Sequence, residues 1–186
     1  MELAAIVGAR LRAARRDRHL SLAALAAAAG IGKGSLSEIE NGVRNPTLGT
    51  LYALADALGV PLATLLDGRV GARITSPGIE ARLLDVTTEA DASTVEVYRL
   101  SFEPGTNRIA GGHGQGVVEH LLVTSGRLRV GRHGEEHEIG PGESLQWTSD
   151  VEHSYLALGD DPVHSVLVIR SSGAAGRAAS SVESVV

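Results

Sequence analysis

The chain has no cysteine among its 186 residues, which excludes disulfide bonds, zinc–thiolate sites and cysteine nucleophiles. Aromatic residues are scarce at 3% of the chain, so a core must be built mostly from aliphatic side chains and alanine. Long apolar runs are also missing, and none reaches the roughly 20 residues of a membrane-spanning helix. Arginines interrupt the N-terminal stretch every few positions, which excludes the apolar core of a signal peptide. These absences predict a cytoplasmic protein with no membrane partner.

An excess of positive charge is lacking as well, because the formal net charge is −5. The two signs are unevenly spread along the chain. Residues 1–68 carry seven basic and six acidic side chains, whereas residues 69–186 carry ten basic and sixteen acidic ones. Most of the basic groups of the first segment lie between Arg10 and Arg18. This asymmetry favours a nucleic-acid-binding head attached to an acidic body.

Up to about Leu66, apolar residues recur at three- and four-residue steps, which is typical of short amphipathic helices. Ser21 is a good N-cap for a second helix, and Gly30 and Gly59 are good terminators of the second and fourth. The apolar fraction of 43% is enough for a buried core. The sequence predicts five helices in a compact bundle, the first from about residue 3 and the others at about 22–29, 33–40, 48–58 and 62–66.

After residues 67–68 the apolar period changes to two, which indicates strands separated by glycine-containing turns. Expected strands include 95–102, 119–123, 127–131, 143–147 and 164–169. Short strands at this spacing favour an antiparallel sandwich or barrel. We therefore predict an α + β protein with a helical domain over 1–66, a linker over 67–77, a β domain over 78–170 and a disordered tail over 171–186.

The helical segment contains the string LSLAALAAAAGIGKGSLSEIENGVRNPT from Leu20 onward. It resembles the phage-repressor-like (xenobiotic-response-element type) helix-turn-helix family over about residues 5–66. The resemblance implies that helix 33–40 enters the major groove of double-stranded DNA. Gly32 and Gly34 depart from the serine or threonine that is usual there. The implied DNA-binding residues are Lys33, Gly34, Ser35, Ser37 and Glu38 at base edges, and Ser21, Arg44 and Asn45 at phosphates.

In the strand segment, Pro104-Gly105 is followed by His113, Glu119 and Gly126, and Gly140-Pro141-Gly142 is followed by His153. This order resembles the two motifs of the cupin family from Pro104 to His164. The resemblance implies an antiparallel double-stranded β-helix barrel. Together, the two resemblances imply a transcription regulator in which the cupin domain senses a ligand.

In metal-binding cupins, histidines and a glutamate from these motifs hold one divalent metal. Here Gln115 stands at the second histidine position, and Ala157 stands where an asparagine follows the last histidine. The resemblance leaves His113, Glu119 and His153 as a two-histidine, one-carboxylate set, which suits a divalent transition metal. The alternative is an organic-ligand pocket without metal. The implied effector pocket comprises His113, Gln115, Glu119, His153 and Tyr155.

Three functions fit these resemblances. The first is a regulator whose barrel senses a small molecule or metal and whose head binds a palindromic operator as a homodimer, since one head buries too little surface for useful specificity. The second is a non-haem, metal-dependent cupin enzyme resembling hydroxypropylphosphonate epoxidase, which carries the same type of head. Five residues separate His113 from Glu119, whereas that enzyme's pattern has three, which favours the regulator and no catalytic residues. The third is a structural cupin that only dimerises the head.

Overall fold

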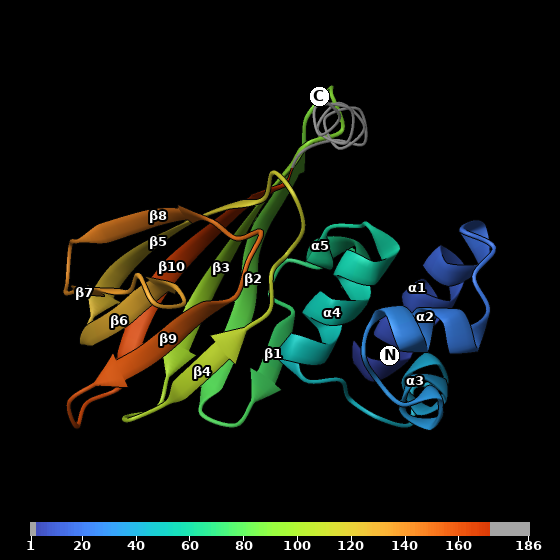
Figure 1. Cartoon of the computed structure of the whole chain (residues 1–186), viewed down its shortest axis with the longest axis horizontal. Coiled ribbons are helices and arrows are strands. Elements are labelled where there is room, and N and C mark those ends of the chain that lie inside the picture. Colours follow the sequence, from blue (N-terminus) through green and yellow to red (C-terminus); the bar gives the residue numbers. More distant parts are fainter. Residues whose placement is uncertain (1–2, 172–186) are drawn as a thin grey trace. The chain divides into compact units, whose positions relative to one another are not determined.

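The computed structural model describes residues 3–171. The chain divides into two compact units, one that ends at Ala72 and one that begins at Arg73. The first unit is helical and the second consists of strands (Figure 1).

Five helices form the first unit, as predicted: α1 Leu3–Asp17, α2 Leu22–Ala28, α3 Lys33–Glu40, α4 Leu48–Leu58 and α5 Leu62–Leu65. Capping residues set their ends. The Ser21 hydroxyl accepts a hydrogen bond from the Ala24 amide at the start of α2, and the Thr47 hydroxyl accepts one from Thr50 at the start of α4. Gly59 ends α4 in the left-handed conformation, with φ at 61°.

The core of the helical unit is aliphatic, as the scarcity of aromatic residues requires. Leu11 of α1, Leu25 of α2, Leu36 of α3 and Leu54 of α4 are fully buried. Burying one leucine side chain stabilises a fold by about 1.5–3 kcal/mol. Helices of 7, 8 and 4 residues (α2, α3 and α5) are too short to be stable alone, so this packing holds them.

The second unit has ten strands between residues 73 and 171: β1 Arg73–Ser76, β2 Ile79–Thr88, β3 Thr94–Phe102, β4 Asn107–Ala110, β5 Val118–Ser125, β6 Arg127–Arg132, β7 His137–Ile139, β8 Ser144–Thr148, β9 His153–Leu158 and β10 Val163–Ser171. All the strand pairs are antiparallel. The six-stranded sheet has the order β1-β2-β3-β10-β5-β8, and the four-stranded sheet has the order β4-β9-β6-β7 (Figure 1).

The two sheets pack face to face through their inward side chains. Phe102 of β3 stacks on Tyr155 of β9 with ring centroids 5.7 Å apart, and Leu121, Val123, Leu128 and others fill the interior. The strand pairing corrects the prediction of a closed barrel. Among residues 3–171 no strand of one sheet is hydrogen-bonded to a strand of the other. The two sheets therefore form a two-layer sandwich that only side-chain packing holds together.

Part of the expected linker is regular structure. Residues 73–76 form β1, which pairs with β2 across a tight turn and buries Ile74. The expected disordered tail begins at Ser171, which ends β10, and its other residues lie outside the described part of the chain. Within 3–171, no helix combines the length and the apolar character needed to cross a membrane.

Candidate functional site

The α2–α3 pair presents one face of α3 to solvent. Leu36 and Ile39 are buried in the bundle, whereas Lys33 and Glu38 are exposed on the opposite side. Gly34 is also exposed, Ser35 and Ser37 are partly exposed, and Ser21 caps α2. The predicted base-reading residues thus lie on one accessible helix face. A helix of this kind can enter a major groove.

Three residues of α1 fix the position of α3. Gly8 lies so close to the end of α3 that an added Cβ would be 2.4 Å from the Ile39 carbonyl oxygen. The Arg15 guanidinium donates from Nε and Nη2 to the two carboxylate oxygens of Glu40, at 2.6 and 2.8 Å. Arg12 donates to the Glu40 backbone oxygen at 3.1 Å. The hydrogen bond from Arg15 to Glu40 raises the pKa of Arg15, although its burial acts in the opposite direction.

These contacts give the arginines of α1 a structural role that the charge pattern alone did not identify. The sequence signal that could have found it is a glutamate at a buried helical position of α3. Arg10 also pairs within the unit, with Asp67. The basic cluster of α1 is therefore partly neutralised within the bundle.

The loop after α3 carries the predicted phosphate-contacting residues. Arg44 and Asn45 are both exposed. The Arg44 guanidinium lies 3.3 Å from the Ser35 hydroxyl and 3.5 Å from the Glu38 carboxylate, so it folds back over the solvent face of α3. Val43 beside it is 78% exposed. The sequence pattern did not predict that this polar loop exposes an apolar side chain to such an extent. The loop and α3 form one continuous surface.

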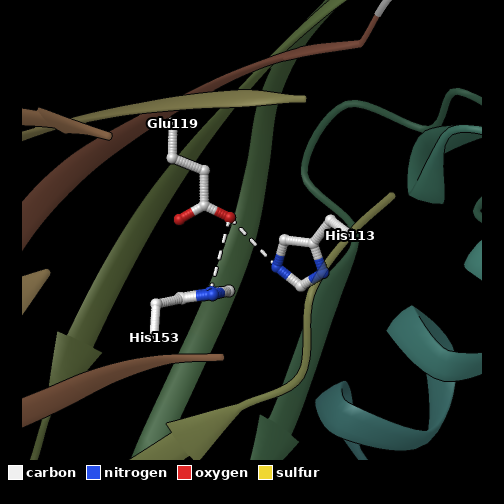
Figure 2. A group of neighbouring side chains, drawn as sticks. All are labelled: His113, Glu119 and His153. Carbon is white, nitrogen blue, oxygen red and sulfur yellow. Dashed lines mark ion pairs between the residues drawn. The ribbon is translucent and has the colours of Figure 1, made fainter. Parts of the chain in front are cut away.

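A second cluster lies inside the sandwich. Glu119 comes from β5, His153 from the start of β9, and His113 from the loop between β4 and β5. His113 Nε2 is 3.0 Å and His153 Nε2 is 3.6 Å from the same carboxylate oxygen, Glu119 Oε1. Figure 2 shows both imidazole rings turned toward that oxygen. The three potential ligand atoms all lie within 4.8 Å of one another.

Neighbouring groups orient each member of this cluster. The Tyr155 hydroxyl donates to Glu119 Oε2 at 2.9 Å and leaves Oε1 facing the histidines. His153 Nδ1 lies 3.2 Å from the Val151 carbonyl oxygen, and donation to that oxygen leaves the lone pair on Nε2, facing the cluster. The same pattern of outer hydrogen bonds holds metal-binding histidines and carboxylates in proteins.

Gly112 positions His113. An added Cβ at Gly112 would be 2.5 Å from the Asp150 carbonyl oxygen, so the loop approaches the 149–151 segment very closely. The His113 amide donates to the Ser149 carbonyl oxygen at 2.6 Å. This contact joins the loop that carries His113 to the segment that leads into His153.

The cluster is almost sealed from water. Glu119 and His153 are 0% exposed. Burial raises the pKa of Glu119, but the close contact with His113 and the charges of His113 and His153 outweigh it and leave that pKa lowered. Burial lowers the pKa of His153, against the opposing effect of the Glu119 charge. A divalent cation binds an ionised carboxylate and neutral imidazoles, and its own charge would favour those forms of the three residues.

The orphaned atoms of this cluster fit a metal ion. Neither Glu119 Oε1 nor His153 Nε2 has a hydrogen bond of good geometry among the described residues, although both are fully buried. A buried polar atom without a partner costs about 1–3 kcal/mol. Two imidazole nitrogens and one carboxylate oxygen that converge in this way are a suitable donor set for iron, manganese, nickel or zinc.

The predicted pocket residues do not all come together. His113, Glu119, His153 and Tyr155 lie inside the sandwich, whereas Gln115 is exposed on the loop before β5. Gln115 therefore does not share the buried environment of the other four. His120 is exposed on the other face of β5, as the strand period predicts. Trp147 of β8 lies beside the cluster: its ring centroid is 6.0 Å from that of His153 and 6.2 Å from that of Tyr155.

Two protein-family models match the two units. The helix-turn-helix model matches residues 11–65, and the cupin domain model matches residues 98–169. The helix-turn-helix match spans α2 and α3, and the cupin match spans all three residues of the buried cluster.

Individual relatives agree with both matches. The HTH-type transcriptional regulator SutR of Escherichia coli is 30% identical over 165 residues, which cover 87% of this chain and 93% of SutR. The immunity repressor protein of Bacillus phage phi105 is 38% identical over 60 residues, 32% of this chain and 42% of the repressor. The crystal structure of an HTH_3 family transcriptional regulator from Vibrio cholerae shares the fold, with a TM-score of 0.79, 23% identity and coverage of 91% and 97% of the two chains. The chain therefore belongs to the HTH-type transcriptional regulators and is a DNA-binding regulator that joins a helix-turn-helix domain to a cupin domain.

Proposed function

We propose that residues 1–66 act as a DNA-reading head that binds a palindromic operator as a homodimer. Lys33, Ser37 and Glu38 face solvent on α3 and supply donors and acceptors for base edges. Arg44 and Asn45, with the amides at Ser21, contact phosphates beside them. Two heads on a dimer would place half-sites about 10 bp apart or at a multiple of that spacing.

We propose further that the β unit, which begins at Arg73, is the sensor of this regulator. His113, Glu119 and His153 hold one divalent transition metal, and the binding of the metal or of a small molecule beside it changes the affinity of the head for DNA. A bound metal would supply a Lewis acid with open coordination positions, to which an oxygen or nitrogen atom of an effector can bind.

The observation that carries this proposal is the buried, converging cluster. Glu119 Oε1 and His153 Nε2 are enclosed without a hydrogen bond of good geometry, while Tyr155 and the Val151 carbonyl hold the other atoms of the same two side chains. These two atoms therefore face the interior of the cluster, where a metal ion would give both of them a partner. A structural cupin that served only dimerisation would be more stable with aliphatic residues there.

The test combines metal analysis with DNA binding. We expect the purified chain to bind about one equivalent of Mn²⁺, Fe²⁺, Ni²⁺ or Zn²⁺, and the Glu119→Ala/His153→Ala double variant to bind none. His120→Ala is the matched control, because His120 neighbours Glu119 but is exposed. Equal metal binding by the double variant and the parent would refute the assignment of the ligands.

A second candidate function rests on the same donor set. Two histidines and one carboxylate with open positions are also the ligands of non-haem iron oxygenases. Oxygen consumption by the Fe²⁺-loaded chain in the presence of an organic substrate, lost in the double variant, would favour this enzyme over the sensor. DNA affinity that responds to metal or ligand without turnover would favour the sensor.

A further inference from the structure

Trp147 carries a buried hydrogen-bond donor that has no acceptor. The residue is 6% exposed, and its indole Nε1 is enclosed without a partner among the described residues. Trp147 is directly opposite Glu119 in the β5–β8 ladder, so both side chains lie on the inner face of the sheet. Its ring adjoins those of His153 and Tyr155 at 6.0 and 6.2 Å. The unsatisfied indole therefore belongs to the wall of the buried cluster.

Arg108 is a basic residue of the facing, four-stranded sheet. It lies in β4 directly opposite Tyr155 of β9, and side chains that face each other in an antiparallel pair lie on the same side of the sheet. Asn107 and Ile109 on either side of it are exposed, whereas Arg108 itself is half-buried. Within residues 3–171, no hydrogen bond or ion pair involves its guanidinium.

The other arginine on this inner face is already paired. Arg132 lies opposite His153 in the β6–β9 ladder, and its guanidinium is 3.7 Å from the Asp150 carboxylate. Arg108 has no such acidic partner. A half-buried guanidinium without a counter-ion is costly, and an added anion would satisfy it.

We propose that Arg108 and Trp147 form the anion-recognising part of the effector site, and that the effector is a small carboxylate. The inference rests on the proposed sensor function and deepens it by naming the class of ligand. A guanidinium fork matches the two oxygens of a carboxylate, and the single indole N–H can bond one of them. Sulfate arranges its oxygens in a tetrahedron, which a planar guanidinium fork and one indole N–H match less well.

The chain offers a direct probe, because Trp147 is its single tryptophan. The full chain is titrated with acetate, oxalate and succinate, and separately with the neutral acetamide, oxamide and succinamide. We expect at least one of the acids to change the tryptophan fluorescence in a saturable way, and calorimetry to give the same dissociation constant. We expect the amides to bind at least about tenfold more weakly, since they lack the charge that strengthens hydrogen bonds to the guanidinium. Sulfate should also bind more weakly, because its tetrahedral oxygens do not match the planar guanidinium fork.

Two variants assign the donors. Arg108→Gln should weaken binding of that acid by at least about tenfold. Arg127→Gln is its control, because Arg127 is exposed on the outer face of the same sheet. Trp147→Phe, followed by calorimetry, should weaken binding several-fold, because it removes the indole N–H that we assign to the carboxylate. Full circular dichroism spectra confirm that each variant is folded.

The results separate this inference from the sensor proposal. The inference is overturned if none of the acids binds, if the amides or sulfate bind equally well, or if Arg108→Gln binds like the parent. The sensor proposal is overturned separately, if an acid binds through Arg108 but DNA affinity does not respond to any occupancy of the site. DNA affinity that responds to metal while no acid binds would leave the sensor standing and remove the carboxylate site.

Discussion

The ion pair between Arg15 and Glu40 joins α1 to α3, and its removal tests how α3 is held in place. The side chains of Arg15 and Glu40 are 13% and 3% exposed, so the pair is shielded from water at the contact between α1 and α3. Glu40→Ala removes two charge-assisted hydrogen bonds, of 2.6 and 2.8 Å, and leaves Arg15 with its bond to the Leu20 carbonyl. Bonds of this kind contribute about 1.5–3 kcal/mol each, and the remaining exposure of Arg15 lets water recover part of the loss.

We therefore expect Glu40→Ala to lower the free energy of unfolding by about 3 kcal/mol, measured by urea denaturation followed by circular dichroism. Glu138→Ala is the matched control, because it breaks an Arg129–Glu138 pair whose side chains are 47% and 50% exposed. Water replaces that contact, so no measurable change is expected from the control. Equal effects of the two substitutions, or a loss below about 1 kcal/mol for Glu40→Ala, would refute the reasoning.

Three further predictions concern the DNA surface, the cluster and the pH dependence of stability. Lys33→Ala should weaken operator binding by about 1–3 kcal/mol more than it weakens binding to random DNA, and equal losses on both DNAs would contradict base reading. Arg44→Ala should weaken binding to both DNAs and reduce the slope of log affinity against log salt concentration by about one. Gly112→Ala should weaken metal binding because its Cβ would press on the Asp150 carbonyl, and calorimetry with Mn²⁺ checks this against the fold measured by circular dichroism. The hydrogen bond from Ser154 lowers the pKa of Glu136 to about 2, so ionised Glu136 stabilises the fold fully above the ordinary pKa of a glutamate, and this contribution is lost as pH falls toward 2. Glu136→Gln should therefore make the free energy of unfolding less dependent on pH in urea titrations at pH 2–5.

The helical half was predictable because its signals are local. Caps such as Ser21 and Thr47 and the apolar spacing of α4 mark helix boundaries within a few residues, and the structure places the helices within one or two residues of the expected limits. The Arg15–Glu40 contact was not predictable, because its partners are 25 residues apart and only the packing of α1 against α3 brings them together.

The strand half was harder because its pairing is non-local. β1 was hidden in an expected linker, and the apolar alternation of β2 is broken where a bulge between Leu83 and Asp85 shifts the register. The motif spacing identified His113, Glu119 and His153 as candidate ligands. The pairing of Trp147 with Glu119 and of Arg108 with Tyr155 is visible only in the strand register of the structure. A sequence period identifies the inward face of one strand and cannot tell which other strand lies across from it.

The control of DNA binding by the buried cluster is tested most directly by operator affinity. An operator is first selected from random-sequence DNA, and fluorescence anisotropy then measures the dissociation constant with chelator, with Mn²⁺ or Fe²⁺, and with metal plus the tightest-binding carboxylate. We predict that occupancy of the cluster changes the dissociation constant of the parent by about 5–150-fold, the usual range of such coupling. The Glu119→Ala/His153→Ala variant should bind the operator with one affinity under all three conditions. A parent whose affinity is the same under all three, or a double variant that responds as the parent does, would contradict a sensor at this site.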